Sequence, residues 1–205
     1  QGVMNDISLS LKEVYNASKV VIVPGSGTFG MEAVARQFGS KKKALVIRNG
    51  WFSFRWSQIL EMGKIPSDTV ILKAKQINAN KDAPFTPYEL SRAIARIKEE
   101  RPDVVFAPHV ETSAGLMLHD EYLKGIAEAT HQIGGILVVD CIAAGAIWLD
   151  MKKIGIDVLI SAPQKGWSGS PCCALVMLSD NAVELLGRTT STSCACDLKK
   201  WAEIM

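Results

Sequence analysis

Short apolar runs alternate along this chain with longer segments in which apolar positions recur at helical spacing. The apolar runs are rich in Val, Ile and Leu, which is typical of strands that are buried on both faces. Gly or Pro stands at most of the joints between the two kinds of segment. The pattern predicts strands near residues 20–23, 44–48, 69–73, 104–107, 136–140, 157–161 and 173–178.

The segments between these strands predict helices over residues 28–38, 52–62, 87–100, 119–133 and 181–186, and an amphipathic helix over 197–205. Repeated strand and helix units favour a mainly parallel sheet covered by helices on both faces. The last strand follows Lys165 after few residues, through Gly169-Ser170-Pro171. A parallel crossover needs about a dozen residues, so this link favours an antiparallel return. The predicted fold is a three-layer α/β domain (α-β-α) with a mostly parallel seven-stranded sheet.

Composition and charge narrow the class of protein. A length of 205 residues, of which 48% are hydrophobic, is enough for one globular domain with a sizeable core. A net charge of +2 argues against nucleic acid as the main partner. The longest run of like charge, at residues 41–43, is interpreted as a solvated turn. Since no apolar run approaches membrane-spanning length, no membrane partner is expected.

The cysteines indicate a compartment rather than a scaffold. Five cysteines at irregular spacing predict neither a disulfide framework nor a zinc site. Together with the lack of an amino-terminal signal pattern, they favour the reducing cytoplasm. Cys172 and Cys173 begin an apolar strand, so we expect both thiols to be buried and inert.

The two ends suggest a piece of a longer protein. The chain opens at Gln1 rather than at a methionine, and it closes at Met205 inside a predicted helix without a stop signal. We expect residues 1–20 to form an N-terminal helix or linker, and residues 21–205 to form one large domain.

The most informative stretch is the turn after the sixth predicted strand, which carries Ser161, Pro163, Gln164 and Lys165. Pro163 ends the strand, so the lysine stands at the carboxyl end of a buried strand. Ligands of open α/β sheets bind at this edge. An amine held there is a candidate nucleophile for an aldehyde, although most lysines in loops simply reach into solvent.

A second candidate site follows the first predicted strand, where residues 25–28 (Gly-Ser-Gly-Thr) open a helix. Small residues let backbone N–H groups approach an anion at the positive end of the helix, and the Ser26 and Thr28 hydroxyls add donors. A phosphate site is one interpretation, and a turn that serves only helix packing is the other. The glycine spacing also fits G-x-G-x-x-G, but a dinucleotide site needs an acidic residue at the end of the second strand, where Arg48 stands.

Aromatic residues gather after the second predicted strand. Trp51, Phe52, Phe54 and Trp56 are more than one helix start needs for packing, so one of them is a candidate to lie on a planar heterocycle. We assign Phe54 and Trp56 to packing.

Polar residues also follow the fourth and fifth predicted strands. His109 and Glu111 are interpreted either as a base and its orienting partner or as a satisfied loop histidine, and Thr112 is a hydroxyl donor. Asp140 ends the fifth strand after four apolar residues, and a buried carboxylate needs a positive partner to stay ionised. The partner of Asp140 could be a ribose hydroxyl, a metal ion or a protonated ring nitrogen. No second carboxylate stands beside it, so no metal site is expected.

An anion cradle, an aromatic residue, a hydroxyl, a strand-end aspartate and a lysine one strand later are what pyridoxal phosphate requires. From about residue 21 to 205 the sequence resembles the large domain of the class V aminotransferases, fold type I, and is most similar to the alanine–glyoxylate and serine–pyruvate branch. The segments that carry this resemblance are residues 24–28, 49–50, 109–115, 139–140 and 161–165.

By position, the resemblance implies which residues carry the chemistry. Lys165 matches the lysine that forms the internal aldimine with the cofactor and then moves a proton. Asp140 matches the carboxylate that pairs with the pyridine nitrogen, and Ile142 matches a contact to one ring face. Phe52 falls where the family usually has a stacking tryptophan, with Trp51 beside it as the alternative.

The resemblance also implies the remaining contacts. Thr112 would contact the phenolic oxygen, and Ser161 would contact the phosphate or support its ligands. His109 and Arg55 also match family positions, but no chemical role is implied for them. His109 would form a wall of the site, and Arg55 would be a structural residue. The phosphate would be held by Ser26, Gly27, Thr28 and Gln164.

The activity implied is transamination between a small amino acid and a 2-oxo acid, of the alanine or serine with glyoxylate or pyruvate type. A homodimer with its active site at the interface is implied as well, together with a C-terminal small domain beyond this chain that grips the substrate carboxylate. A lyase or desulfurase of the same fold is the alternative, although none of the five cysteines matches the desulfurase nucleophile. A fragment that binds the cofactor without activity is another.

Overall fold

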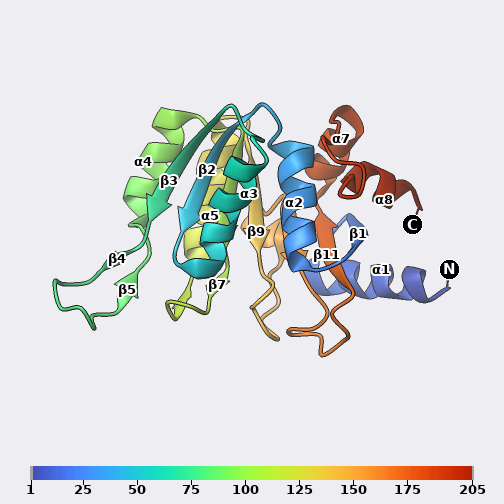
Figure 1. Cartoon of the computed structure of the whole chain (residues 1–205), viewed down its shortest axis with the longest axis horizontal. Helices are drawn as coiled ribbons and strands as arrows, with labels where there is room; N and C mark the ends of the chain where they lie inside the picture. The colour runs from blue at the N-terminus through green and yellow to red at the C-terminus, as the bar shows by residue number, and fades with distance from the viewer. Residues whose placement is uncertain (1, 205) are drawn as a thin grey trace.

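The computed structural model describes residues 2–204. Its helices are α1 (Gly2–Tyr15), α2 (Gly27–Phe38), α3 (Trp51–Met62), α4 (Leu90–Glu100), α5 (Asp120–Gln132), α6 (Met151–Ile154), α7 (Asp180–Arg188) and α8 (Leu198–Ile204). The strands of the main sheet are β1 (Lys19–Pro24), β2 (Lys43–Arg48), β3 (Asp68–Lys73), β6 (Val104–Pro108), β9 (Ile136–Asp140), β10 (Val158–Ser161) and β11 (Cys173–Leu178). Two small hairpins, β4 (Lys75–Gln76) with β5 (Phe85–Thr86) and β7 (Val110–Glu111) with β8 (Leu116–Met117), complete the fold shown in Figure 1.

The main sheet has seven strands in the order β1-β11-β10-β9-β6-β2-β3. Strand β11 pairs antiparallel with both β10 and β1, and the other neighbouring strands pair in parallel. The predicted antiparallel return of the last strand is therefore confirmed. The carboxyl ends of the parallel strands lie at one edge of the sheet, which is the lower edge in Figure 1. The loops after β9 and β10 extend from this edge.

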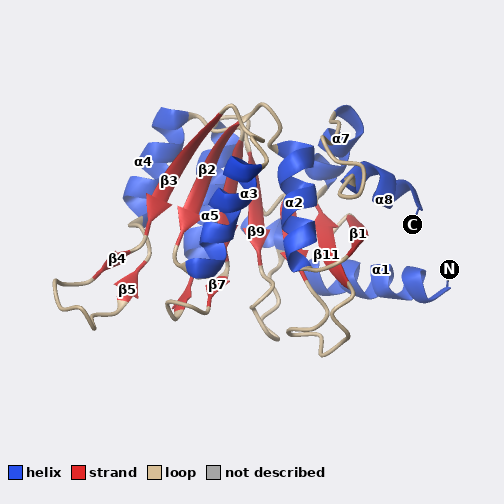
Figure 2. Ribbon diagram, viewed as in Figure 1, coloured by secondary structure: helices blue, strands red, loops and turns tan. Residues whose placement is uncertain are grey.

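Helices cover both faces of the sheet, so the predicted three-layer architecture is confirmed (Figure 2). One face packs against α2, α3, α7 and α8, and the other packs against α1, α4, α5 and α6. Alternate residues of a strand point to opposite faces. In β9, for example, Val138 belongs to the first of these cores and Val139 to the second.

Helix α1 packs onto the same sheet as the rest of the chain. Leu11 and Tyr15 are buried, and they join Val20 of β1 in the core on the α5 face. The Tyr15 ring also meets the rings of Trp148 and Trp167 edge to face, at centroid distances of 5.9 and 6.1 Å. These contacts tie the amino-terminal helix to the loops that follow β9 and β10.

Some elements differ from the sequence prediction. Helix α4 begins at Leu90 rather than at residue 87, because Thr86 pairs with Lys75 in the β4–β5 hairpin and holds the preceding chain extended. The hairpins and the four-residue helix α6 were not predicted, since elements of two to four residues have too little periodicity to detect. The last predicted helix is present as α8, and its proposed end at Met205 lies outside the described residues.

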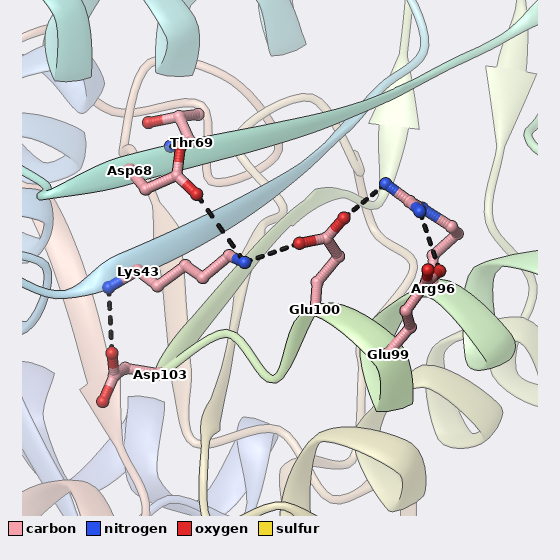
Figure 3. A network of polar contacts seen from close by, with 7 residues as sticks. All are labelled: Lys43, Asp68, Thr69, Arg96, Glu99, Glu100 and Asp103. Atoms are coloured by element: carbon pink, nitrogen blue, oxygen red, sulfur yellow. Dashed lines mark hydrogen bonds and ion pairs between the residues drawn. The ribbon is translucent and has the colours of Figure 1, made fainter.

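The basic run at residues 41–43 is only partly the solvated turn that was expected. Lys43 begins β2, and its ammonium group forms ion pairs with Glu100 at 2.5 Å and Asp68 at 3.6 Å (Figure 3). The backbone N–H of Lys43 donates to Asp103 at 2.9 Å, and Arg96 pairs with Glu100 from the other side. This network joins β2, β3 and α4 at the amino edge of the sheet, opposite the edge where ligands of such sheets bind.

Candidate active site

A cavity of about 260 Å³ opens at the carboxyl edge of the parallel strands, between the loops that follow β1, β6, β9 and β10 and the start of α3. Every cofactor residue predicted from the sequence except Ser161 lines it. The lining therefore brings together Lys165, Asp140 and the small-residue turn at residues 26–28, which are far apart in the chain. Three further residues, which the sequence did not predict as cofactor contacts, also line it: Arg55, Val110 and Ala143.

The turn between β1 and α2 is built for close approach. Gly25 has φ +124°, a conformation that residues with a Cβ rarely adopt, and Ser26 then enters α2 as its N-cap. The Ser26 side chain makes no capping hydrogen bond in the described structure, so it leaves the first N–H groups of α2 open to a ligand, and residues 26–28 line the cavity. A Cβ added at Gly27 would lie 2.4 Å from Ile142 Cδ1. The turn thus brings backbone donors and a helix N-terminus to the cavity wall.

Arg55, for which the sequence predicts only a structural role, lines the cavity. It lies in α3, and its Nη1 donates to Thr28 Oγ1 at 3.1 Å while the guanidinium stands 5.6 Å from the centroid of the Phe52 ring. A cation is therefore joined directly to the anion cradle. The useful signal in the sequence was its position one helical turn after Trp51 and Phe52, which start the helix at the cavity.

Asp140 is only 8% exposed, and its Oδ1 accepts the N–H of Ile142 at 2.9 Å. Burial raises the pKa of this carboxyl to about 6, and the Ile142 N–H and the nearby charge of Arg55 offset only part of that effect. A buried carboxylate with so few donors favours a cationic partner in the cavity. A protonated ring nitrogen has the required charge and hydrogen-bonding proton.

The lysine turn packs tightly on the loop after β9. A Cβ at Gly166 would lie 2.0 Å from the carbonyl oxygen of Gly145, so the two backbones touch and hold the Lys165 and Asp140 loops together. Lys165 and Gln164 both line the cavity. The Gln164 Oε1 atom is buried without a hydrogen-bond partner in the described structure, which indicates a missing donor at that point.

The start of α3 supplies the aromatic wall. Phe52 lines the cavity, whereas the Trp51 side chain is 65% exposed and lies outside the lining. Trp56 packs in the core on Phe106 at a centroid distance of 4.4 Å, as predicted, and Phe54 lies under the Arg48 guanidinium. Of the two candidates for a stacking residue, the geometry favours Phe52.

Glu111 holds this helix start in place. Its carboxylate is fully buried and accepts the N–H groups of Phe52 and Ser53 and the hydroxyls of Ser53 and Ser113. These four donors lower the pKa of Glu111 despite the opposing effect of burial. The interpretation of His109 and Glu111 as a base and its orienting partner is not supported, because the Glu111 carboxylate contacts α3 and Ser113 instead.

Two predicted positions lie away from the cavity. Ser161 is 3% exposed and follows Ile160, which packs on the α2 face, so strand alternation turns the Ser161 hydroxyl to the opposite face beside Tyr15 and Cys141. It is therefore not a direct cavity contact. His109 is 2% exposed, its Nδ1 is buried without a partner among the described residues, and burial lowers its pKa.

The expected burial of the paired cysteines is wrong for Cys172. Cys172 is exposed and Cys173 is half-buried, because the link from Gly169 to Cys172 lies outside the sheet and β11 begins only at Cys173. Neither thiol lines the cavity that holds Lys165. They stand instead beside a separate apolar cavity.

The cavity fits pyridoxal phosphate in the chemistry of its walls. Its donors, the α2 N-terminus with Ser26, Thr28 and Arg55, suit a phosphate dianion. The unpartnered Gln164 oxygen and the buried Asp140 carboxylate can each accept a hydrogen bond from a ligand. Phe52 and Ile142 provide apolar contacts for a ring. Lys165 supplies the amine that an aldehyde needs.

Among residues 2–204, no helix combines the length and the apolar character needed to cross a bilayer.

Comparisons with known proteins agree with this chemistry. The chain is 32% identical over 203 residues to a 2-aminoethylphosphonate–pyruvate transaminase of Paraburkholderia phymatum, covering 97% of this chain and 50% of that protein. It is 27% identical over 184 residues to alanine–glyoxylate aminotransferase of Rattus norvegicus, covering 88% of this chain and 41% of the relative. The chain thus spans about half the length of the curated relatives it matches.

The fold matches as well. The structure superposes with a TM-score of 0.82 on ureidoglycine–glyoxylate aminotransferase from Bacillus subtilis, at 23% identity, covering 99% of this chain and 52% of the other. Residues 2–200 match the family described as aminotransferase class-V. The chain therefore belongs to the class V aminotransferases, a family that depends on pyridoxal phosphate.

Proposed function

We propose that this chain is the cofactor-binding part of a transaminase that moves an amino group between a small amino acid and a 2-oxo acid, with Lys165 as the reactive amine. The observation that carries the proposal is the convergence of Lys165, Asp140 and the turn at residues 26–28 on one cavity. Each of the three stands at a different strand end, and together they supply a nucleophile, a carboxylate and an anion site.

The phosphate end is assigned to the α2 N-terminus. The N–H groups of the first turn, the hydroxyls of Ser26 and Thr28, and the Gln164 side chain would hold the phosphate by hydrogen bonds. Arg55, bonded to Thr28, would balance the phosphate charge. Ser161 is left out of this assignment because its hydroxyl lies on the other face of the sheet.

The ring end is assigned to Asp140. When bound, pyridoxal phosphate supplies an electrophilic aldehyde carbon and a pyridine ring that accepts an electron pair from the substrate. The Asp140 carboxylate would hold a proton on the ring nitrogen, and Phe52 and Ile142 would contact the two ring faces and exclude water. Thr112 would donate to the phenolic oxygen. Lys165 Nζ would bind the aldehyde carbon and afterwards take the proton from the substrate Cα.

The substrate pair is proposed at the level of its chemistry. Alanine or serine is proposed as the amino donor, and glyoxylate or pyruvate as the acceptor. The names of the relatives support the acceptor, because pyruvate and glyoxylate recur in them. The donor differs among those names, which include 2-aminoethylphosphonate.

A desulfurase-like reaction shares the fold and is the alternative function, but none of the described cysteines is placed for it. A cysteine desulfurase is among the similar folds, at 17% identity and a TM-score of 0.64. All five cysteines lie within the described part of the chain, and none of them lines the cavity. The nucleophilic thiol that such a reaction uses is therefore lacking from this site as described.

A cytoplasmic homodimer is the proposed state of the whole protein. Five free cysteines are in keeping with a reducing compartment. Exposed Trp51 adjoins the cavity residue Phe52, and exposed Ile147 and Trp148 stand in the loop after Asp140, so large apolar side chains flank the site. A second subunit would cover them, and light scattering of the whole protein tests this.

Borohydride trapping tests the function directly. Purified chain is mixed with pyridoxal 5′-phosphate, scanned for the absorption band of lysine-bound cofactor, reduced, digested and mapped by mass spectrometry. We expect one reduced adduct on Lys165, and none there in the Lys165→Ala variant. Adducts spread over exposed lysines such as Lys41 and Lys42, with Lys165 unmodified, would overturn the assignment. Amino donors are then screened on the whole protein with glyoxylate and with pyruvate.

A further inference from the structure

Cys172 and Cys173 place two thiols side by side at the surface. Their Sγ atoms are 3.8 Å apart, and both cysteines are free. Neighbouring residues of a regular strand point to opposite faces, so such a distance requires that the chain leave the strand at this point. It does so because the Cys172 N–H donates to the Ser170 carbonyl at 2.9 Å, in a turn that precedes β11. The pair is therefore preformed rather than brought together by a rearrangement.

The surroundings of the two thiols differ. Cys172 is exposed, whereas Cys173 is half-buried, and burial together with the adjacent thiol raises the pKa of Cys173 to about 11. Both border an apolar cavity of about 380 Å³ between α1 and the link before β11, whose walls include Ile7, Leu11 and Trp167. Small molecules reach the pair from this open side. Cys172 is thus the sulfur that meets a reagent first, with Cys173 directly behind it.

The backbone of this pair touches the phosphate cradle. The carbonyl oxygen of Cys172 accepts the N–H of Gly25 at 2.9 Å, and Cys173 pairs with Pro24 at the end of β1. Gly25 is the residue at φ +124° that turns the chain into α2. Any rotation of the Cys172–Cys173 peptide group therefore moves a hydrogen bond that shapes the turn at residues 25–28.

We propose that Cys172 and Cys173 form a reversible modification site for small disulfides of the glutathione class, and that its closure to a vicinal disulfide loosens the phosphate cradle at Gly25. The Cys172 thiolate attacks one sulfur of the small disulfide, forming a mixed disulfide and releasing one small thiolate. The Cys173 thiolate then attacks Cys172 Sγ and releases the second. The two protein thiols are oxidised, the small disulfide is reduced to two thiols, and the two protons pass from the cysteines to the released thiolates.

Ring closure has to act on the backbone. Consecutive Cα atoms are about 3.8 Å apart across a trans peptide, whereas a relaxed disulfide separates its Cα atoms by about 4.4 Å or more. The closed ring is therefore strained, and the strain bears on the peptide between the cysteines, which carries the carbonyl that holds the Gly25 N–H. Strained and exposed disulfides are also the easily reduced ones, which makes the modification reversible.

The first experiment measures disulfide closure and its effect on the Gly25 hydrogen bond, without any cofactor. The purified chain is equilibrated with glutathione disulfide, and its mass and its amide hydrogen exchange are compared with those of the dithiothreitol-reduced chain. We expect a loss of two hydrogens in the peptide that contains residues 172–173, with no glutathione retained there. We also expect about fivefold faster exchange at the Gly25 amide, as for the weakening of one backbone hydrogen bond, and full reversal by dithiothreitol.

Matched variants separate this site from ordinary thiol chemistry. The double variant Cys194→Ser/Cys196→Ser removes the two other cysteines that are close to each other in the sequence. It should leave disulfide closure and the faster exchange at Gly25 unchanged. Cys172→Ser and Cys173→Ser should each abolish closure and make exchange at Gly25 insensitive to glutathione disulfide. Exposed Cys194 serves as the internal control, because it should keep one glutathione as a stable adduct. A stable adduct on Cys172 without closure, or closure without faster exchange at Gly25, would overturn the proposal.

The effect on cofactor affinity rests on the proposed function and is measured separately. We expect the dissociation constant of pyridoxal 5′-phosphate to rise about fivefold on closure, again as for one weakened hydrogen bond. An unchanged dissociation constant would overturn the proposed link between disulfide closure and cofactor affinity. A chain that closes the disulfide and changes exchange at Gly25, yet binds no cofactor in either state, would overturn the proposed function and support the modification site.

Discussion

The carboxylate of Glu111 accepts both the backbone N–H and the hydroxyl of Ser53, at 2.8 and 2.7 Å. This pair joins the loop after β6 to the first turn of α3, and so it joins Thr112 and Phe52, which lie on two walls of the same cavity. The contact is close because residue 50 is glycine, where a Cβ would lie 2.4 Å from Ser113 Oγ and 2.8 Å from the Glu111 carboxyl carbon. One buried anion thus caps the helix that carries the aromatic wall.

Glu111→Gln should lower the free energy of unfolding by about 2–4 kcal/mol, because buried N–H and O–H donors lose a charged acceptor and the new amide N–H₂ faces other donors. Urea unfolding of the chain measures it. The same substitution at the exposed Glu121 is the control and should change stability by less than about 0.5 kcal/mol. Equal effects at the two positions would show that Glu111 does not hold α3.

The pKa of about 6 at Asp140 predicts a pH dependence of stability in the cofactor-free chain. The folded state binds the proton more tightly than the unfolded state, so the stabilising effect of protonation is complete below the unfolded pKa near 3.8 and is lost as the pH rises through about 6. Relative to Asp140→Asn, the wild-type chain should lose on the order of 2–3 kcal/mol between about pH 4 and about pH 8.

Denaturant unfolding of both chains over that range checks this expectation. The Asp140→Asn chain is its own matched reference, because asparagine keeps the size and does not titrate. A difference between the two chains that stays constant with pH would contradict the raised pKa. Cofactor binding should reduce the pH dependence, since a cationic ring nitrogen would stabilise the ionised carboxylate.

The His131–Asp157 pair predicts a second pH dependence, at the amino edge of the sheet. His131 Nε2 lies 2.8 Å from Asp157 Oδ2, and this hydrogen bond raises the pKa of His131. The stabilisation is therefore complete below the unfolded pKa of about 6.5 and is lost as the pH rises through the higher folded value. His131→Gln, which keeps a donor but does not titrate, should lower the melting temperature more at about pH 5.5 than at about pH 9.

Melting curves of the two chains at both pH values measure this difference. Asp157 also accepts the Leu137 N–H and the Asn181 side chain. Those bonds do not depend on the protonation of His131, so part of the network should persist in the variant. A larger loss at the higher pH would contradict the direction of the pKa shift.

Gly27→Ala should weaken cofactor binding about tenfold without unfolding the chain. The added Cβ would lie 2.4 Å from Ile142 Cδ1, so the end of the Ile142 side chain must move within a cavity that both residues line. Adding Ile142→Val removes Cδ1 and should restore most of the affinity. Fluorescence titration with pyridoxal 5′-phosphate measures both.

Gly30→Ala is the matched control for this prediction, three residues along the same helix. Its Cβ would lie 2.4 Å from Ala174 Cβ, so it should disturb the packing of α2 on β11 and lower thermal stability. Equal losses of affinity in Gly27→Ala and Gly30→Ala chains of equal stability would refute the local effect at Ile142.

Much of this arrangement could be predicted because strand ends of a parallel sheet meet at one edge. Once the apolar runs were placed, Ser26, Thr112, Asp140 and Lys165 were expected at the same edge of the sheet, and the strand order then brought them to one cavity. The antiparallel return of β11 followed from the length of the link before it. Phe52 could be named but not chosen over Trp51, because adjacent residues at a helix start differ in direction by about 100°.

Other features depended on contacts between distant segments. Arg55 becomes a cavity residue only because α3 packs beside the turn that carries Thr28. Cys172 is exposed because it ends the link that lies outside the sheet, directly before β11 begins at Cys173. Ser161 lies beside Tyr15 and Cys141 rather than in the cavity, and only the packing of β10 between the two helical layers shows to which face its hydroxyl points.

By itself, the sequence determined the α/β class, the order of the elements and the chemical groups available at the strand ends, because periodicity and turn residues act locally. Only the tertiary structure decided which of those groups share a cavity, how deeply Asp140 is buried and therefore how its pKa shifts, and that Glu111 caps a helix almost sixty residues away. Those properties arise from packing between segments that are distant in the chain, and no local pattern specifies them.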